Sequence, residues 1–437
     1  MEKDKNMKTY GYNQKDYQKF KKYATYMLIG FSIMYLFFYN GRQNMNLAIP
    51  LMTEELNATN AEIGMVSSAL FWCYGFGHLF SGRLGEIVGN KRFIFWGVVL
   101  SAVLNLIISF QASLVVIAIL WGVNGFAQSM AWSPGIAMSN KWWPTDKRGF
   151  ASGVITGSSG VAQIVTYISV LAAYKISPNM GWRAAFRWPL VPMIIILVVF
   201  LALVKNEPKD IGLDDFKEPD QEAAELEAAR MKELEGKGPV YPFICLLREP
   251  KMCMFLLIIA IGGIGRYGML TWIPTYFNET MGMDVKSGIV ASVLLPLGQA
   301  SAFFLMPVLT DKVFKGKREP LLVVCGAVSV VSLIIFPNIT SQGAASAMLL
   351  IVGFCKWYCM GICGRYRNKS LCGNGNRTFG LGGIYGCGSS VNFVRFCKWK
   401  ELECGIYYDS STVCTFGSIG ILCKKYEGTW NSTVKIK

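Results

Sequence analysis

Charged residues are scarce in this chain. Asp, Glu, Lys and Arg make up only 16% of its 437 residues, whereas 52% are hydrophobic and the mean hydropathy is +0.36. Soluble domains usually carry about 25% charged residues. The shortage excludes a soluble enzyme, a disordered protein and a nucleic-acid-binding domain, although a net charge of +15 alone would suit the last class. We therefore expect no nucleic-acid partner.

Catalytic and metal-binding patterns are missing as well. His78 is the only histidine, and no nucleophile, base and orienting acid fall together in a recognisable motif. The cysteines at Cys355, Cys359, Cys363 and Cys372 are not spaced as a C-x-x-C pair. Zinc sites usually combine Cys and His ligands at such short spacings. We expect no enzyme activity, no metal and no cofactor.

Long apolar runs are what the chain has instead. They are about 20 residues long, the length of an α-helix that crosses a hydrocarbon core of about 30 Å. The chain is therefore predicted to be an all-α polytopic membrane protein in contact with lipid. Ten spans are predicted, at residues 23–52, 65–85, 93–110, 114–138, 151–174, 188–204, 252–277, 287–309, 321–336 and 341–354.

A polar segment divides these spans into two groups. The N-terminal segment carries seven lysines and has no apolar stretch before a cleavage site, so we do not expect a secretory signal. The predicted organisation is an N-terminal segment at 1–22, a six-helix bundle at 23–204, a linker at 205–250, a second bundle with four recognisable helices at 251–354, and a tail at 355–437.

Basic residues predict the orientation in the membrane, because Lys and Arg near span ends tend to remain in the cytoplasm. The loops after spans two and four hold Lys91, Arg92, Lys141, Lys147 and Arg148, whereas residues 53–60 and 111–113 hold no Lys or Arg. The N-terminus and the central linker are therefore predicted to be cytoplasmic. We expect a multi-pass protein of the cell membrane, which is the inner membrane in a bacterium with two.

The two groups of spans contain an internal repeat. Gly41-Arg42 precedes Ile49-Pro50 with six residues between, and Gly265-Arg266 precedes Ile273-Pro274 with the same gap. A second repeated pattern consists of one acidic and two basic residues. It is formed by Glu86, Lys91 and Arg92 in the first half and by Asp311, Lys317 and Arg318 in the second. Repeated halves in a polytopic membrane protein point to a substrate site at their interface near the midplane of the bilayer. Two six-helix halves are therefore predicted.

Arg42 and Arg266 are both embedded in apolar sequence. A guanidinium group at the bilayer centre costs at least about 2.5–3.5 kcal/mol, and no Asp or Glu lies within ten residues of either arginine. A bound anion is the natural partner, because the planar arginine fork matches pairs of phosphate oxygens. The alternative is that both arginines snorkel or bond backbone carbonyls. Their equivalent positions in the repeat favour a phosphate clamp.

Motifs around these arginines are similar to those of one transporter family. Tyr35, Tyr39, Arg42 and Asn44 fit the pattern Y-x-x-x-Y-x-x-R-x-N, and residues 266–276 fit R-Y-G-x-L-x-W-x-P-T-Y. The chain thus resembles the organophosphate:phosphate antiporters of the major facilitator superfamily over about residues 23–354. The resemblance implies the major facilitator fold, a monomer, and exchange of inorganic phosphate for a sugar phosphate or glycerol phosphate by alternating access.

The resemblance also implies a set of site residues. Those expected at the substrate are Arg42, Arg266, Tyr35, Tyr39, Tyr74, His78, Gln128, Tyr267 and Trp272. His78 stands where the family often has a lysine. It could add a charge that varies near neutral pH, or it could be a packed, neutral imidazole. A histidine of glycerol-3-phosphate transporters is replaced by Ser159, and a family tyrosine by Gly263, which weakens an assignment to that substrate.

Residues 82–92 resemble the short loop between spans two and three that locks the inward surface in this superfamily. The gating residues expected there are Arg83, Glu86, Lys91 and Arg92, and the repeat adds Asp311, Lys317 and Arg318. A symmetric gate needs such a pair of loops. The same charges could instead serve only as topology signals.

The tail does not match the family. Residues 355–437 hold nine of the thirteen cysteines and twelve Lys or Arg against four Asp or Glu. They contain no uncharged apolar stretch of 18 residues, so the last two of twelve helices are missing or garbled. A shift of reading frame near residue 354 restores a small-residue membrane helix. We hypothesise a frameshift in the gene or its sequence, which resequencing across codon 355 decides.

Two other functions remain open at this stage. Paired arginines can also hold carboxylates, so a carrier of another organic anion such as a sugar acid is one alternative. A transporter-like membrane sensor of sugar phosphate is the other.

Overall fold

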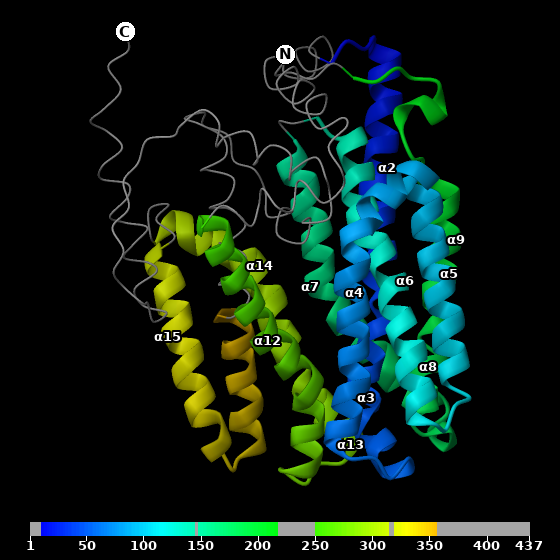
Figure 1. Ribbon diagram of the computed structural model, residues 1–437. Coiled ribbons are helices and arrows are strands. Elements are labelled where there is room, and N and C mark those ends of the chain that lie inside the picture. The colour runs from blue at the N-terminus through cyan, green and yellow to red at the C-terminus, as the bar shows by residue number, and fades with distance from the viewer. Residues whose placement is uncertain (1–9, 145–146, 217–249, 314–318, 356–437) are drawn as a thin grey trace.

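The computed structural model describes residues 10–144, 147–216, 250–313 and 319–355, and every regular element in these residues is helical (Figure 1). The expected all-α fold is therefore confirmed. Residues 1–9 of the predicted N-terminal segment, most of the predicted linker and the tail after Cys355 lie outside the described residues.

The first helix group forms one bundle (Figure 1). Two large apolar clusters hold it together, one around Phe31, Trp132 and Phe200 and the other around Met52, Trp121 and Phe186. The elements are α2 (Gln14–Phe38), α3 (Asn40–Glu55), α4 (Asn60–Val88), α5 (Asn90–Ile108), α6 (Leu114–Trp142), α7 (Arg148–Ile176), α8 (Arg183–Arg187) and α9 (Leu190–Leu203).

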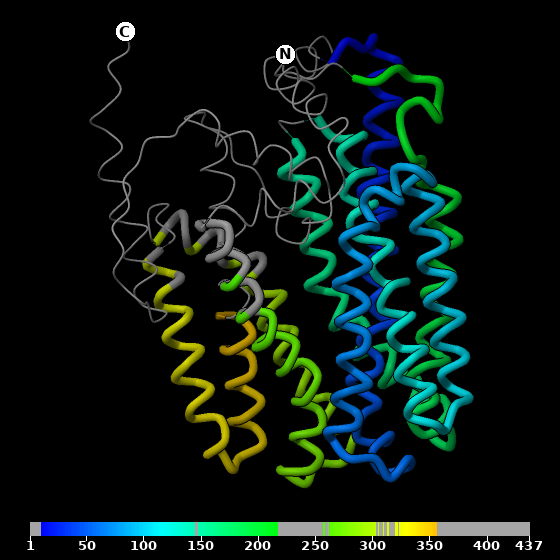
Figure 2. Tube along the Cα trace, viewed as in Figure 1, coloured from blue at the N-terminus to red at the C-terminus, as the bar shows by residue number. Residues whose placement is uncertain are grey.

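The second helix group lies beside the first, as the chain trace shows (Figure 2). Its core is a smaller apolar cluster around Phe277, Leu295 and Leu349. The elements are α12 (Pro250–Glu279), α13 (Val285–Ser292), α14 (Leu294–Lys312), α15 (Glu319–Ile335) and a last described helix at Gln342–Cys355.

Six helices among the described residues are long and apolar enough to cross a membrane, and two shorter apolar helices follow at Val323–Asn338 and Gln342–Cys355. The predicted first span is divided between α2 and α3, because the helix is interrupted at Tyr39. The predicted span 287–309 is likewise divided between α13 and α14 at Val293.

The expected loop between the second and third spans is only one residue long. A capping box formed by Thr59 and Glu62 starts α4, which continues to Val88, and α5 begins at Asn90. Arg83 and Glu86 therefore lie on the last turns of α4 and not in a loop. The prediction that residues 82–92 form a loop was wrong in this respect.

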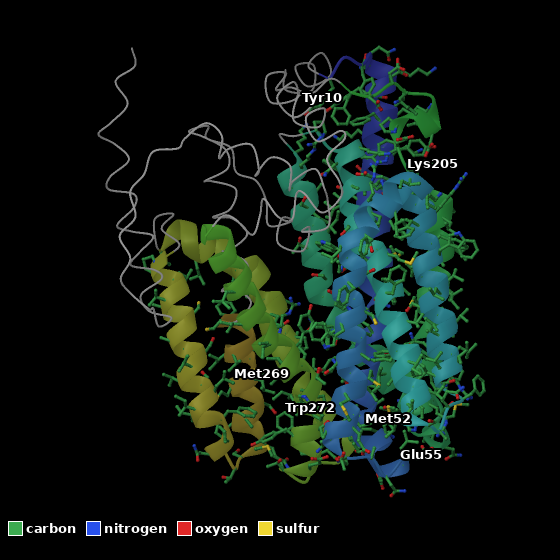
Figure 3. All side chains as sticks on the ribbon, in the orientation of Figure 1. Tyr10, Met52, Glu55, Lys205, Met269 and Trp272 are labelled. Carbon is green, nitrogen blue, oxygen red and sulfur yellow. The ribbon has the colours of Figure 1, made fainter. Side chains whose placement is uncertain are left out.

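The two helix groups meet at one end of the molecule. In Figure 3, Met52 and Glu55 mark this lower end, and Tyr10 and Lys205 mark the opposite, upper end. At the lower end Asn60 donates hydrogen bonds to Glu279 at 3.0 and 3.2 Å, joining α4 to α12. Ile289 of α13 packs into the apolar cluster that also contains Met52.

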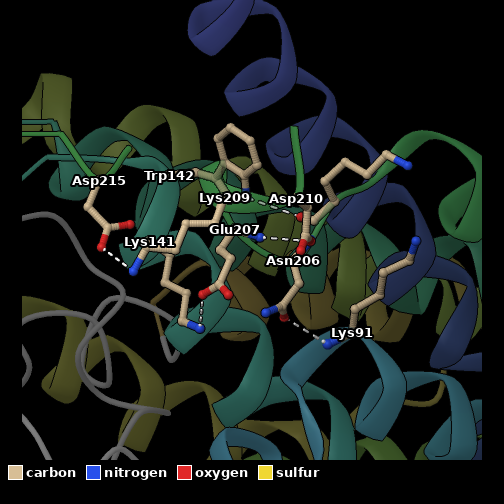
Figure 4. A network of polar contacts seen from close by, with 9 residues as sticks. Lys91, Lys141, Trp142, Asn206, Glu207, Lys209, Asp210 and Asp215 are labelled. Atoms are coloured by element: carbon tan, nitrogen blue, oxygen red, sulfur yellow. Dashed lines mark hydrogen bonds and ion pairs between the residues drawn. The ribbon is translucent and has the colours of Figure 1, made fainter. Parts of the chain in front are cut away.

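At the upper end, residues 205–216, here called the strap, fold back over the first bundle (Figure 4). Glu207 accepts from Lys141 Nζ at 2.7 Å, and Asn206 Oδ1 accepts from the Lys91 backbone N–H at 3.2 Å. The Trp142 indole donates to the Lys205 carbonyl at 3.1 Å. The start of the linker is thereby attached to α5 and α6.

Tyr12 also holds the strap, because its hydroxyl donates to the Asp214 carbonyl. Burial, and then the carboxylates of Asp215, Asp214 and Asp16, raise the pKa of the Tyr12 phenol to about 12. The protonated phenol therefore favours the docked strap. This contribution is complete below the unfolded pKa of about 10 and is lost as the pH rises through about 12.

Ultraviolet absorbance against pH measures the ionisation of the tyrosines. We expect the difference between the native protein and Tyr12→Phe to show one phenol with a pKa of about 12. Tyr26→Phe, on the helix α2 that follows Tyr12, is the comparison for loss of one tyrosine. A difference titration centred near 10, the ordinary value for tyrosine, would contradict the docked geometry.

Candidate functional site

Arg42 lies on α3, just after the interruption of the first span. Its side chain is 7% exposed, and its guanidinium carbon lies 4.0 Å from the ring centre of Tyr39 and 4.9 Å from that of Tyr74. Its Nε has no hydrogen-bond partner among the described residues. Buried polar groups are almost always paired, so an unpaired arginine nitrogen here indicates a place for a ligand.

Arg266 occupies the corresponding place on α12. Its side chain is 2% exposed, and its guanidinium carbon lies 5.5 Å from the ring centre of Tyr267. The Tyr267 ring packs against Phe71 of α4, with 5.0 Å between ring centres, and Tyr74 on the same helix α4 packs against Arg42. The fold thus brings the two arginines, which are far apart in sequence, to one region between the two helix groups.

Aromatic side chains surround this region. Tyr35 packs against Tyr39 and against Trp132, with ring centres 5.4 and 5.1 Å apart. On the other side, the rings of Tyr267 and Phe71 are 5.0 Å apart and connect α12 to α4. Aromatic faces carry negative charge density, so they stabilise guanidinium groups in the absence of an acid.

Trp272 lies one and a half turns beyond Arg266 on α12, towards the lower end (Figure 3). A Cβ added at Gly64 of α4 would lie 3.4 Å from the Trp272 ring. Trp272 therefore packs against the first bundle.

His78 and Arg42 both pack against Tyr74. The His78 ring packs edge-on against Tyr74 with 4.3 Å between ring centres, and its Nδ1 lies 3.4 Å from Ser133 Oγ. Since Tyr74 also contacts Arg42, the histidine lies behind the tyrosine. Both expectations for His78, a variable charge and a packed neutral ring, remain predictions.

Gln128 makes its contacts with protein groups. Its Nε2 donates to Ser101 Oγ at 2.8 Å and to the Phe38 carbonyl at 3.4 Å. The neighbouring Asn105 and Asn124 are fully buried and both donate to the Gly41 carbonyl, at 3.0 and 2.8 Å. Sequence reasoning did not single out these asparagines, although an amide inside an apolar span is a signal for a bond between helices.

The sequence model of the Major Facilitator Superfamily matches residues 31–394. The chain belongs to this superfamily. The matched range extends past Cys355, where we expected the likeness to end. The frameshift hypothesis for the tail stays a prediction.

Individual relatives are more distant. The chain is 26% identical to the phosphoglycerate transporter protein of Salmonella typhimurium, over 76% of this chain and 73% of that one. It is 24% identical to the glycerol-3-phosphate transporter of Bacillus subtilis and to the membrane sensor protein UhpC of Escherichia coli, in each case over 69% of this chain and 68% of the other. These matches confirm the resemblance stated from the sequence motifs.

Solved structures support the fold. A bacterial homologue of the human lysosomal transporter Spinster, in an inward-facing and unoccupied conformation, superposes with a TM-score of 0.64 at 14% identity, over 86% of this chain and 80% of that one. A D-xylose-proton symporter superposes with a TM-score of 0.59 at 15% identity, over 86% and 88%. The chain is thus a multi-pass membrane protein with the fold of this superfamily, which points to transport and not to catalysis.

The expected gating residues of the first half lie at the upper end of α4 and the start of α5. Arg83 Nη1 is 3.3 Å from Glu86 Oε2, and both side chains are partly exposed. Lys91 Nζ donates to the Leu201 carbonyl at 2.7 Å, while Arg92 is exposed. Such exposed pairs contribute little to stability.

The expected gating residues of the second half are less completely described. Asp311 lies on the last turn of α14. Lys317 and Arg318 lie outside the described residues, so the symmetry of the gate remains a prediction.

Proposed function

We propose that this chain is a secondary transporter that exchanges an organic phosphate ester for inorganic phosphate by alternating access. The observation that carries the proposal is the pair of buried arginines, one from each half, that each pack against tyrosine rings. Two cations in a site walled by aromatic rings attract a multiply charged anion. The names of the relatives, transporters of phosphoglycerate and of glycerol 3-phosphate, support a phosphate ester as the cargo.

The physical basis of exchange is the cost of the empty site. Two guanidinium groups that face one region of low dielectric constant repel each other, so the protein resists closure when no anion lies between them. A phosphate dianion bound between them removes this cost and favours the closed form. Because a ligand shifts an equilibrium only by its differential affinity for the two forms, transport then requires an anion in each direction.

The assay is counterflow in vesicles loaded with inorganic phosphate. We expect uptake of a labelled phosphate ester only when phosphate is inside, by a version of the chain whose reading frame is restored after residue 354. A panel of hexose phosphates, glycerol 3-phosphate and phosphoglycerate identifies the cargo. Equal uptake into phosphate-free vesicles would contradict obligatory exchange.

Two alternatives are outcomes of the same panel. A probable sulfoacetate transporter of Cupriavidus necator is 24% identical to the chain, and uptake of such an organic anion without phosphate would indicate that class of carrier. Saturable binding of a phosphate ester without any uptake would favour a sensor, the function named for UhpC of Escherichia coli.

Alternating access predicts that the lower end must open during the cycle. Asn60 of α4 and Glu279 of α12 are hydrogen bonded across the two halves there. We expect the double variant Asn60→Cys with Glu279→Cys to lose most of its exchange activity when a short bis-thiol reagent links the two cysteines. Each single variant, treated in the same way, is the control, since the chain has cysteines of its own. Undiminished exchange by the linked double variant would show that this contact does not open.

A further inference from the structure

The polypeptide around Arg42 is held by a group of buried polar side chains that contact its backbone. Ser101 and Asn105 lie on α5, and Asn124 and Gln128 lie on α6. These four residues are here called the amide cluster. A Cβ added at Gly41 would lie 2.6 Å from Ser101 Oγ and 2.8 Å from Gln128 Nε2. A side chain at position 41 would therefore displace these two hydrogen-bonding atoms.

The amide cluster bonds the carbonyl groups on both sides of the helix interruption. The Gly41 carbonyl accepts from Asn124 Nδ2 at 2.8 Å and from Asn105 Nδ2 at 3.0 Å. The Arg42 backbone N–H donates to Tyr39, three residues back, at 3.0 Å. In a regular α-helix the Arg42 N–H would bond the carbonyl four residues back, which is that of Phe38. The tight turn weakens this bond. Gln128 Nε2 lies 3.4 Å from that carbonyl.

Hydrogen bonds within the amide cluster connect its members. Ser101 Oγ donates to Asn124 Oδ1 at 2.7 Å and accepts from Gln128 Nε2 at 2.8 Å. Asn105 Oδ1 accepts from Asn44 Nδ2, on α3 itself, at 3.0 Å. All of these side chains are buried, so a change in one leaves its partners unpaired in a region without water. The amide cluster therefore acts as one unit.

We propose that the amide cluster positions Arg42 by fixing the backbone conformation of residues 38–42. The inference rests on the proposed function, since it takes the anion at Arg42 to be phosphate. A bidentate fork must be held to within about 0.5 Å to bond two oxygens together. Gln128 is then a positioning residue that acts through the backbone of Arg42 and does not touch the substrate.

The first test separates substrate affinity from the amount of active protein. We expect Asn124→Leu and Gln128→Met, which keep the side-chain size but remove the donors, to raise the half-saturating phosphate concentration about tenfold and to leave the maximal exchange rate nearly unchanged. Ser81→Ala is the matched control, because Ser81 Oγ hydrogen bonds to Ser129 Oγ at 2.8 Å and to the Gly77 carbonyl, which lie on α6 and α4. A lower maximal rate with an unchanged half-saturating concentration would overturn the positioning role.

The second test does not depend on phosphate. We expect hydrogen exchange of the backbone amides in residues 38–45 to be faster in Asn124→Leu and Gln128→Met than in the native chain and in Ser81→Ala. Unchanged exchange in this segment would overturn the proposal. If hydrogen exchange is faster in the two variants but the native chain binds no phosphate, the positioning role stands and the proposed function is contradicted.

Discussion

Replacing either Arg42 or Arg266 by lysine is expected to reduce phosphate exchange on the order of 100-fold, while the protein still inserts into the membrane. Lysine keeps the positive charge, but it is a point charge and has no planar fork. Each hydrogen bond to a charged group contributes about 1.5–3 kcal/mol, and every 1.4 kcal/mol is a factor of about ten in affinity. The measurement is counterflow of labelled phosphate in vesicles with equal amounts of each variant.

Arg183→Lys is the matched control for this experiment. Arg183 pairs with Glu55 at the lower end and lies over the Trp182 ring, away from Arg42 and Arg266. A lysine can keep that ion pair, so exchange should stay close to the native rate. If Arg42→Lys or Arg266→Lys exchanged phosphate at the native rate, the two arginines would not form a phosphate clamp.

Gly125→Val is expected to lower the stability of the protein clearly. Gly125 lies on α6 where this helix crosses α4, and a Cβ there would lie 2.3 Å from the Leu70 carbonyl oxygen. The contact is with backbone, so a side chain cannot relieve it by changing rotamer. Overpacking of this kind costs about 1–3 kcal/mol and occasionally more. Small residues at helix crossings are what allows membrane helices to approach each other.

Thermal unfolding in detergent measures this effect. Gly75→Val is the matched control, because Gly75 lies on α4 and a Cβ there would meet no atom within 4 Å. We expect a clear fall in the melting temperature for Gly125→Val and almost none for Gly75→Val. Equal melting temperatures for the two variants would show that α4 and α6 are not packed as closely as the structure has them.

The membrane class, most spans and the two arginines could be predicted from the amino-acid sequence. These features are local: hydropathy is summed over about 20 neighbouring residues, and the cost of a buried Arg42 or Arg266 does not depend on which helix lies beside it. The repeat and the motifs at 266–276 indicated the family for the same reason. The interruption at Tyr39 and the one-residue link at Gly89 were missed, because an apolar run does not show where a helix ends.

The role of Gln128 depended on tertiary structure. From the sequence it belonged with the substrate residues, yet its donors are directed to Ser101 and Phe38, which are 27 and 90 positions away. Asn124 and Gly41 are likewise 83 positions apart. An amide side chain in an apolar span requires a hydrogen-bond partner, and the sequence alone determined this requirement. Which carbonyl it meets depends on how closely α3, α5 and α6 approach at Gly41, and only the packing of the helices decided that.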